Sequence, residues 1–139
     1  MGNSAANLPS IVASSTPVGT VLLVDDDGPT RWLTGQLLRE RSLAVLQAAG
    51  GAAALQVAKE WAGPIDLLLT DIGMPGMGGG ELALRFSAFR PRAKVLFMSG
   101  QSLPVLVQRK AVPADASFLG KPFGVDSLMA AVRAALGAQ

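Results

Sequence analysis

The sequence contains no cysteine and no histidine. The absence of cysteine excludes a disulfide framework and a thiolate metal site. The absence of histidine excludes His-based zinc sites and Ser-His-Asp triads. The sequence also lacks a large excess of charge of one sign, because it has 12 Lys and Arg and 10 Asp and Glu. This balance does not favour direct binding of nucleic acid. The remaining chemistry must rest on carboxylates, hydroxyls, lysine and the backbone.

Long apolar runs are missing as well. No run approaches the ~20 residues that span a bilayer, and the first residues lack the basic start and apolar stretch of a signal peptide. We therefore expect a cytoplasmic protein that does not contact a membrane. Half of the 139 residues are apolar, which is typical of one globular domain with a buried core. Residues 1–19 are rich in Ser, Ala, Asn and Pro, and we expect a disordered tail or linker there, before a domain over 20–139.

From Val21 onward, short apolar runs alternate with helical patterns. In the first helix, Leu33, Leu37 and Leu38 have the spacing of a buried stripe. Strands followed by helices in regular alternation predict an α/β fold, with a five-stranded parallel sheet covered by helices on both faces. The expected strands are 21–24, 43–48, 65–70, 94–98 and 117–119, and the expected helices are 28–41, 52–61, 81–89, 103–111 and 125–136.

Polar side chains follow the ends of four of these strands. They are the run Asp25-Asp26-Asp27, then Asp71, Ser99 and Lys121. Ligands of such sheets bind beyond the carboxyl ends of the strands, so these groups are expected to converge if the four strands are neighbours. Clustered carboxylates repel one another unless a cation lies among them, and aspartate oxygens suit Mg²⁺. Lysine and a hydroxyl are suitable partners for a phosphoryl group. Any one of these residues alone is more often a turn or a cap, and Asp27 is interpreted as a solvated cap of the first helix.

Four segments, VLLVDDD, IDLLLTDIGMPGMGG, KVLFMSG and FLGKPF, resemble the signature blocks of response-regulator receiver domains. The resemblance covers residues 20–136, so the domain over 20–139 is expected to be a receiver domain. It is especially similar to the receivers at the C-termini of hybrid histidine kinases. The resemblance implies a flavodoxin-like, doubly wound sheet of strand order 2-1-3-4-5 with five helices. It also implies a two-component phosphorelay function, in which the domain switches conformation to signal to a partner.

The resemblance assigns roles to the residues at the strand ends. Asp71 would be the phosphoacceptor, and Lys121 would pair with the phosphoryl oxygens. Asp25, Asp26 and Asp71, with the backbone carbonyl of Gly73, would hold Mg²⁺. The domain would then be a phosphoacceptor that assists its own phosphotransfer and autodephosphorylation, and not an enzyme acting on other molecules.

The resemblance also implies a switch and partners. Ser99 would move to hydrogen-bond the phosphoryl group, and Phe118 occupies the position of the aromatic residue that turns inward with it. The donor would be a sensor histidine kinase or a phosphotransfer domain, and an unidentified downstream protein would receive the signal.

Trp32 on the first helix has two interpretations, a partly buried side chain at the edge of the core or an exposed anchor for the donor. Gly124 stands where the last helix usually has Ser or Thr, which weakens that cap.

Three alternatives stay open at this point. The segment from Asp25 to Thr30 resembles the opening motif of haloacid-dehalogenase-type phosphatases, with Asp25 as nucleophile and Asp27 as acid, although Pro29 interrupts that motif. A pseudo-receiver that binds partners without phosphate is the second. The third concerns context, because the domain could act alone or be a piece of a larger kinase.

Overall fold

The computed structural model describes residues 17–137, in which strand and helix alternate throughout. The predicted disordered tail falls mainly on residues 1–16, outside the described residues, and the first strand begins at Gly19, one residue before the expected domain boundary. The strands are β1 (Gly19–Val24), β2 (Leu43–Ala48), β3 (Leu67–Asp71), β4 (Lys94–Ser99) and β5 (Ser117–Gly120). The helices are α2 (Gly28–Arg39), α3 (Gly51–Glu60), α4 (Gly79–Phe89), α5 (Leu103–Gln108) and α6 (Val125–Leu136).

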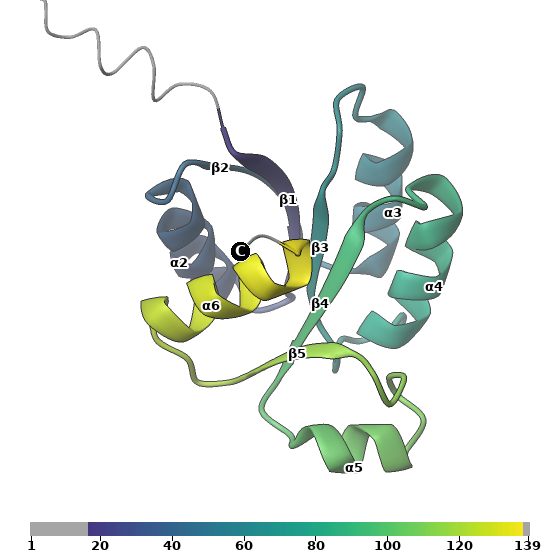
Figure 1. Cartoon of the computed structure of the whole chain (residues 1–139). Coiled ribbons are helices and arrows are strands. Elements are labelled where there is room, and N and C mark those ends of the chain that lie inside the picture. The colour runs from purple at the N-terminus through teal and green to yellow at the C-terminus, as the bar shows by residue number, and fades with distance from the viewer. Residues whose placement is uncertain (1–16, 138–139) are drawn as a thin grey trace, which may run out of the picture.

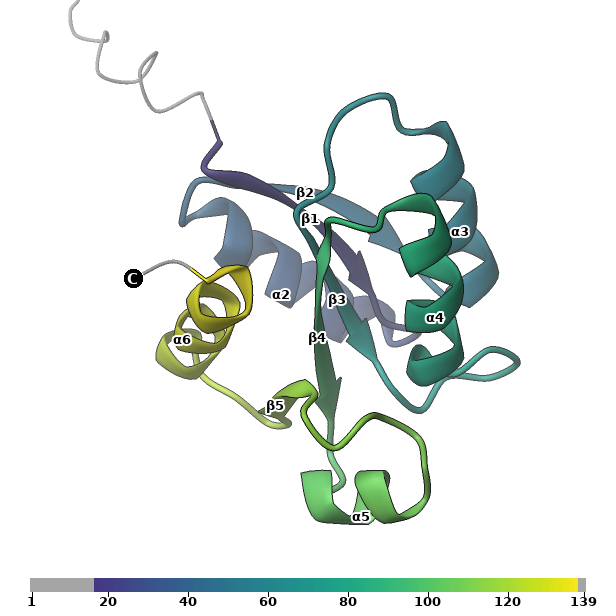
Figure 2. The ribbon, with the colours of Figure 1, turned by 45° about the vertical axis from the view of Figure 1, so that its right-hand side comes forward.

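All five strands are parallel, in the order β2-β1-β3-β4-β5. Helices α2 and α6 cover one face of the sheet, while α3 and α4 cover the other (Figures 1 and 2). The short helix α5 lies beyond the carboxyl end of β4 (Figure 1). The predicted flavodoxin-like architecture and strand order are confirmed.

Two apolar layers hold the helices to the sheet, and alternate residues of β1 supply both of them. Val21 and Leu23 pack toward α2 and α6, whereas Leu22 and Val24 pack toward α3 and α4. All four side chains are almost completely buried. A strand buried on both faces explains the unbroken apolar run of the sequence at this point.

Helix α2 differs from its prediction in the face that it buries. Leu38 is fully buried, but Leu33 is 54% exposed, so the predicted stripe is wrong at that residue. The buried face also includes Thr34 and Gly35. A β-carbon on Gly35 would lie 2.7 Å from the side-chain nitrogen of Gln47, so this glycine allows α2 to approach β2 closely.

The ends of most elements agree with their predictions to within two residues. The largest difference is in α5, which ends at Gln108 where a helix to residue 111 is expected. Lys110, shortly after the end of α5, has a positive φ, as does Ser42 after α2. None of the helices within residues 17–137 is long and apolar enough to cross a membrane.

Candidate functional site

The carboxyl ends of β1 and β3 bring three aspartates together. These strands are parallel neighbours, with Val24 opposite Thr70, so the residues that follow each of them meet at one edge of the sheet. Asp25, Asp26 and Asp71 each offer one carboxylate oxygen, and the three atoms lie within 4.8 Å of one another. This donor set fits a hard divalent cation such as Mg²⁺, which prefers oxygen ligands and uses few carboxylates.

Asp25 is completely buried, and its two carboxylate oxygens and its carbonyl oxygen each accept a hydrogen bond. One carboxylate oxygen accepts the backbone N–H of Asp27 at 3.0 Å, and the other accepts Nζ of Lys121 at 2.9 Å. Its carbonyl oxygen accepts a hydrogen bond from the guanidinium of Arg31. These donors hold the buried carboxylate of Asp25 in a fixed direction.

Lys121 links the acidic residues of the two strands. Its Nζ lies 2.9 Å from Oδ2 of Asp25 and 3.4 Å from Oδ1 of Asp71. Its backbone N–H donates to the carbonyl of Ser99 at 2.8 Å, which anchors the lysine to the end of β4. One ammonium group therefore partly balances two carboxylates.

Burial and charge change two pKa values at this site. Burial raises the pKa of Asp71, and the charges of Asp25 and Asp26 add to that effect, although Lys121 opposes it. Burial would lower the pKa of Lys121, but the hydrogen bond to Asp25 and the charge of Asp71 outweigh it, so this pKa is raised. The lysine is therefore a permanent cation, but its charge does not outweigh the effect of burial on the pKa of Asp71.

The loop after Asp71 holds Gly73 and the start of α4. Gly73 is exposed, and no atom lies within 4 Å of where its side chain would begin. Its carbonyl as a cation ligand stays a prediction. Gly79 is buried against the backbone at the end of β3, and a β-carbon there would lie only 2.4 Å from the carbonyl oxygen of Asp71. A glycine is required at that position because α4 begins in direct contact with the backbone of Asp71.

The two predicted switch residues lie on adjacent strands. Ser99 ends β4 and is 7% exposed, and its hydroxyl accepts the N–H of Gln101 at 3.0 Å. Phe118 on β5 is paired with Phe97 of β4 and packs against the apolar cluster of Phe97, Leu106 and Val112. Their assigned movement stays a prediction.

Trp32 is 61% exposed on α2, so its interpretation as a partly buried edge of the core is wrong. Its neighbour Leu33 borders a groove of about 450 Å³ that Lys121 and Phe123 also line. The exposed apolar surface of α2 therefore continues to the lysine of the acidic site.

The predicted caps agree with the structure. Asp27 is the N-cap of α2 and accepts the N–H of Thr30 at 3.0 Å as well as its hydroxyl. These hydrogen bonds lower the pKa of Asp27. Gly124 precedes α6 and provides no side-chain cap.

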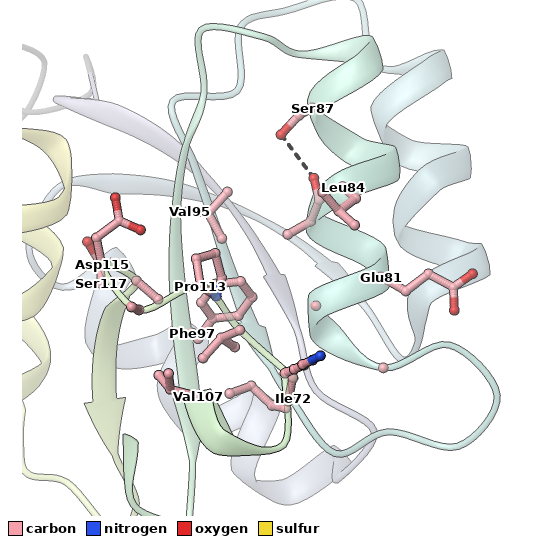
Figure 3. A pocket seen from close by; sticks show the side chains of 18 residues that line it. Ile72, Glu81, Leu84, Ser87, Val95, Phe97, Val107, Pro113, Asp115 and Ser117 are labelled. Carbon is pink, nitrogen blue, oxygen red and sulfur yellow. Dashed lines mark hydrogen bonds between the residues drawn. The ribbon is translucent and has the colours of Figure 1, made fainter. Parts of the chain in front are cut away.

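Two features were not predicted from the sequence. One is Arg31, whose side chain folds back onto the loop after β1. The other is a groove of about 910 Å³ between α4, β4 and the segment after α5, which Leu84, Val95 and Phe97 line (Figure 3). The residues that line this groove do not include the three aspartates, although Ile72, the residue after Asp71, lies at one end of it (Figure 3).

Comparison with known proteins identifies one family. Residues 21–133 match the model described as the response regulator receiver domain. The chain is 32% identical over 120 residues to the sensor kinase CckA of Brucella abortus, which is 86% of this chain but 13% of that protein. It is 36% identical over 109 residues to the response regulator receiver protein CpdR of Brucella abortus, which is 78% of this chain and 89% of that protein.

Solved structures agree with these relatives. The receiver domain of the hybrid histidine kinase CckA shares 36% identity and a TM-score of 0.70, over 85% of this chain and 99% of that chain. A CheY-like receiver domain protein of Methanospirillum hungatei JF-1 shares 29% identity and a TM-score of 0.73, over 86% of this chain and 94% of that chain. The relatives differ in length, so the chain spans nearly all of CpdR but a small part of the CckA kinase.

Proposed function

The chain belongs to the family of response regulator receiver domains, and on that premise we propose that Asp71 accepts a phosphoryl group and that this switches the domain. The observation that carries the proposal is the convergence of three carboxylates within 4.8 Å, with Lys121 at 3.4 Å from Asp71. Carboxylates held for a cation, beside a fixed ammonium group, are suited to phosphoryl transfer, which requires positioning and charge neutralisation above all.

The cofactor in this proposal is Mg²⁺. Asp26 and Asp71 would ligate it directly, the Gly73 carbonyl would add a third protein ligand, and Asp25 would hold it partly through water. The bound ion supplies positive charge to the oxygens of the transferred group. Asp26 is exposed and Asp25 is buried, which supports this division between a direct and an indirect ligand.

The donor in this proposal is a phosphorylated histidine of a sensor kinase or phosphotransfer domain. An ionised oxygen of Asp71 forms the new P–O bond while the P–N bond of the donor breaks, and the imidazole nitrogen keeps the electron pair. Lys121 would balance the charge of the phosphoryl oxygens. This chain has no histidine, so the donor group belongs to another molecule or to a part of a longer chain.

The switch would use Ser99 and Phe118. The Ser99 hydroxyl would turn from the N–H of Gln101 to the phosphoryl group, and Phe118 would turn inward toward the end of β4. Charge-assisted hydrogen bonds are worth roughly 1.5–3 kcal/mol each, and a nearly complete shift between two states takes about 5.5 kcal/mol. Two or three such contacts would therefore bias the equilibrium strongly.

Trp32 is the proposed contact for the donor. Its exposure, together with the groove from Leu33 to Lys121, gives the donor an apolar surface next to the acceptor.

The haloacid-dehalogenase-type alternative is not retained, because the family is that of receiver domains and the buried Asp25 has both carboxylate oxygens occupied.

Titration with BeF₃⁻, a tetrahedral mimic of a phosphoryl group on a carboxylate, tests the proposal. We expect saturable binding that requires Mg²⁺, disappears in Asp71→Ala, and shifts the amide resonances of Ser99 and Phe118. Binding that persists in Asp71→Ala would contradict the proposal. Binding without any change at Ser99 or Phe118 would favour the phosphate-independent pseudo-receiver.

A further inference from the structure

Arg31 holds the acidic loop from the first turn of α2. Its Nη1 donates to the carbonyl oxygen of Asp25 at 2.6 Å, and its backbone N–H donates to the carbonyl oxygen of Asp27 at 2.9 Å. The side chain is half-buried, so this contact is shielded in part from water. Arg31 therefore binds the carbonyl groups on both sides of Asp26, that of Asp25 through its side chain and that of Asp27 through the backbone bond of the first helical turn.

Asp26 depends on that support more than its neighbours do. Its side chain is exposed, and within residues 17–137 no hydrogen bond or ion pair to its carboxylate is found. Asp25 is fixed by Lys121 and by the N–H of Asp27. The direction of the Asp26 carboxylate is therefore set by the backbone on either side of it, which Arg31 holds.

We propose that Arg31 is a positioning residue that sets the affinity of the site for Mg²⁺ by fixing the backbone around Asp26. The inference rests on the proposed function, because it assumes that the three carboxylates hold the ion. Arg31 itself contributes no ligand atom. Outer partners that orient metal ligands typically change the affinity for the metal by 10-fold or more when they are removed.

The charge of Arg31 predicts the opposite effect. A guanidinium near a divalent cation repels it, so removal of this positive charge should strengthen Mg²⁺ binding if charge alone matters. Positioning predicts weaker binding after the same substitution. The direction of the change therefore separates the two explanations.

Calorimetric titration of the full chain with MgCl₂ provides the measurement. We expect roughly 10-fold weaker binding for Arg31→Met, which removes the donor and the charge. Arg31→Lys retains one donor on a long side chain, so its affinity should lie between those of Arg31→Met and the wild type. Arg39→Met is the matched control: it removes an exposed guanidinium at the other end of α2 and should leave the affinity unchanged. Melting temperatures in EDTA establish that each variant is folded.

Each outcome has one consequence. Arg31→Met that binds Mg²⁺ as tightly as the wild type, or more tightly, overturns the inference and leaves the proposed function intact. Wild type that binds no Mg²⁺ contradicts the metal site of the proposed function itself. If Arg31→Met does not fold, Arg31→Gln and Arg31→Lys are compared, and Gln, with the shorter reach, must bind more weakly than Lys.

Discussion

Nζ of Lys121 lies 2.9 Å from Oδ2 of Asp25, a carboxylate that is completely buried at the end of β1. The two residues are 96 positions apart in the chain, so this ion pair joins the first strand to the loop after the last. The same ammonium group reaches Asp71 at 3.4 Å. The acidic site is therefore part of what holds the two halves of the sheet together.

Lys121→Met should destabilise the domain in the absence of Mg²⁺. The substitution leaves a buried carboxylate without its cation, which costs about 3 kcal/mol. Urea unfolding in EDTA measures the loss, and added Mg²⁺ should recover part of it. Lys94→Met is the control. Lys94 is exposed at the start of β4, so its substitution should change the free energy of unfolding very little. Equal stability of the two variants would show that the Lys121–Asp25 pair contributes little.

Asp71→Asn should stabilise the domain at neutral pH without Mg²⁺. Burial raises the pKa of Asp71 above its ordinary value of 3.8, so the folded state carries the ionised carboxylate at a cost that the unfolded chain does not have. The wild type therefore gains stability as the pH falls through the raised pKa, and above that pKa Asp71→Asn should be the more stable of the two proteins. Denaturation in EDTA at a series of pH values checks this. A difference that does not shrink toward low pH would contradict this explanation.

Trp32→Ala should slow phosphotransfer from a phosphorylated histidine donor without changing the melting temperature. The side chain is 61% exposed, so its removal costs little folding energy but removes apolar area that the donor is proposed to contact. Leu84→Ala, at a residue 79% exposed on α4, is the control and should transfer at the wild-type rate. Competition experiments with both variants measure the rates. A slower rate for Leu84→Ala alone would place the docking surface on the other face of the sheet.

Gly79→Ala should destabilise the domain by about 2 kcal/mol, a typical cost of overpacking. The added carbon would lie 2.4 Å from the carbonyl oxygen of Asp71, so α4 or the end of β3 must shift. Gly124→Ala places the same atom in open space before α6 and should be close to neutral. Thermal unfolding of both variants compares them. Equal melting temperatures would show that the backbone at Asp71 can move without cost.

The strands and the acidic cluster could be predicted from the sequence because each has a local signal. The apolar run of β1 stops at Asp25, and that of β3 stops at Asp71, so a parallel sheet brings both carboxylates to one edge. The same argument places Lys121 near them. These three residues make the ion pairs that the structure contains at this edge.

Other features depend on packing that has no local signal. Leu33 has the spacing of a buried residue but is exposed, because Gly35 allows α2 to lie with another face against β2. Arg31 looks like an ordinary solvated residue of a helix, and only the folded loop shows its contact with Asp25. The groove beside α4 combines residues from separate parts of the chain.

Intact mass spectrometry after phosphorylation tests most directly whether Asp71 is the acceptor. The wild type and Asp71→Ala are incubated with Mg²⁺ and either acetyl phosphate or a phosphorylated histidine kinase. We predict that the wild type gains the mass of one phosphoryl group, that EDTA prevents the gain, and that Asp71→Ala gains nothing. A wild type that stays unmodified with both donors, or an Asp71→Ala variant that is modified to the same extent, would contradict the assignment of Asp71 as the phosphoacceptor.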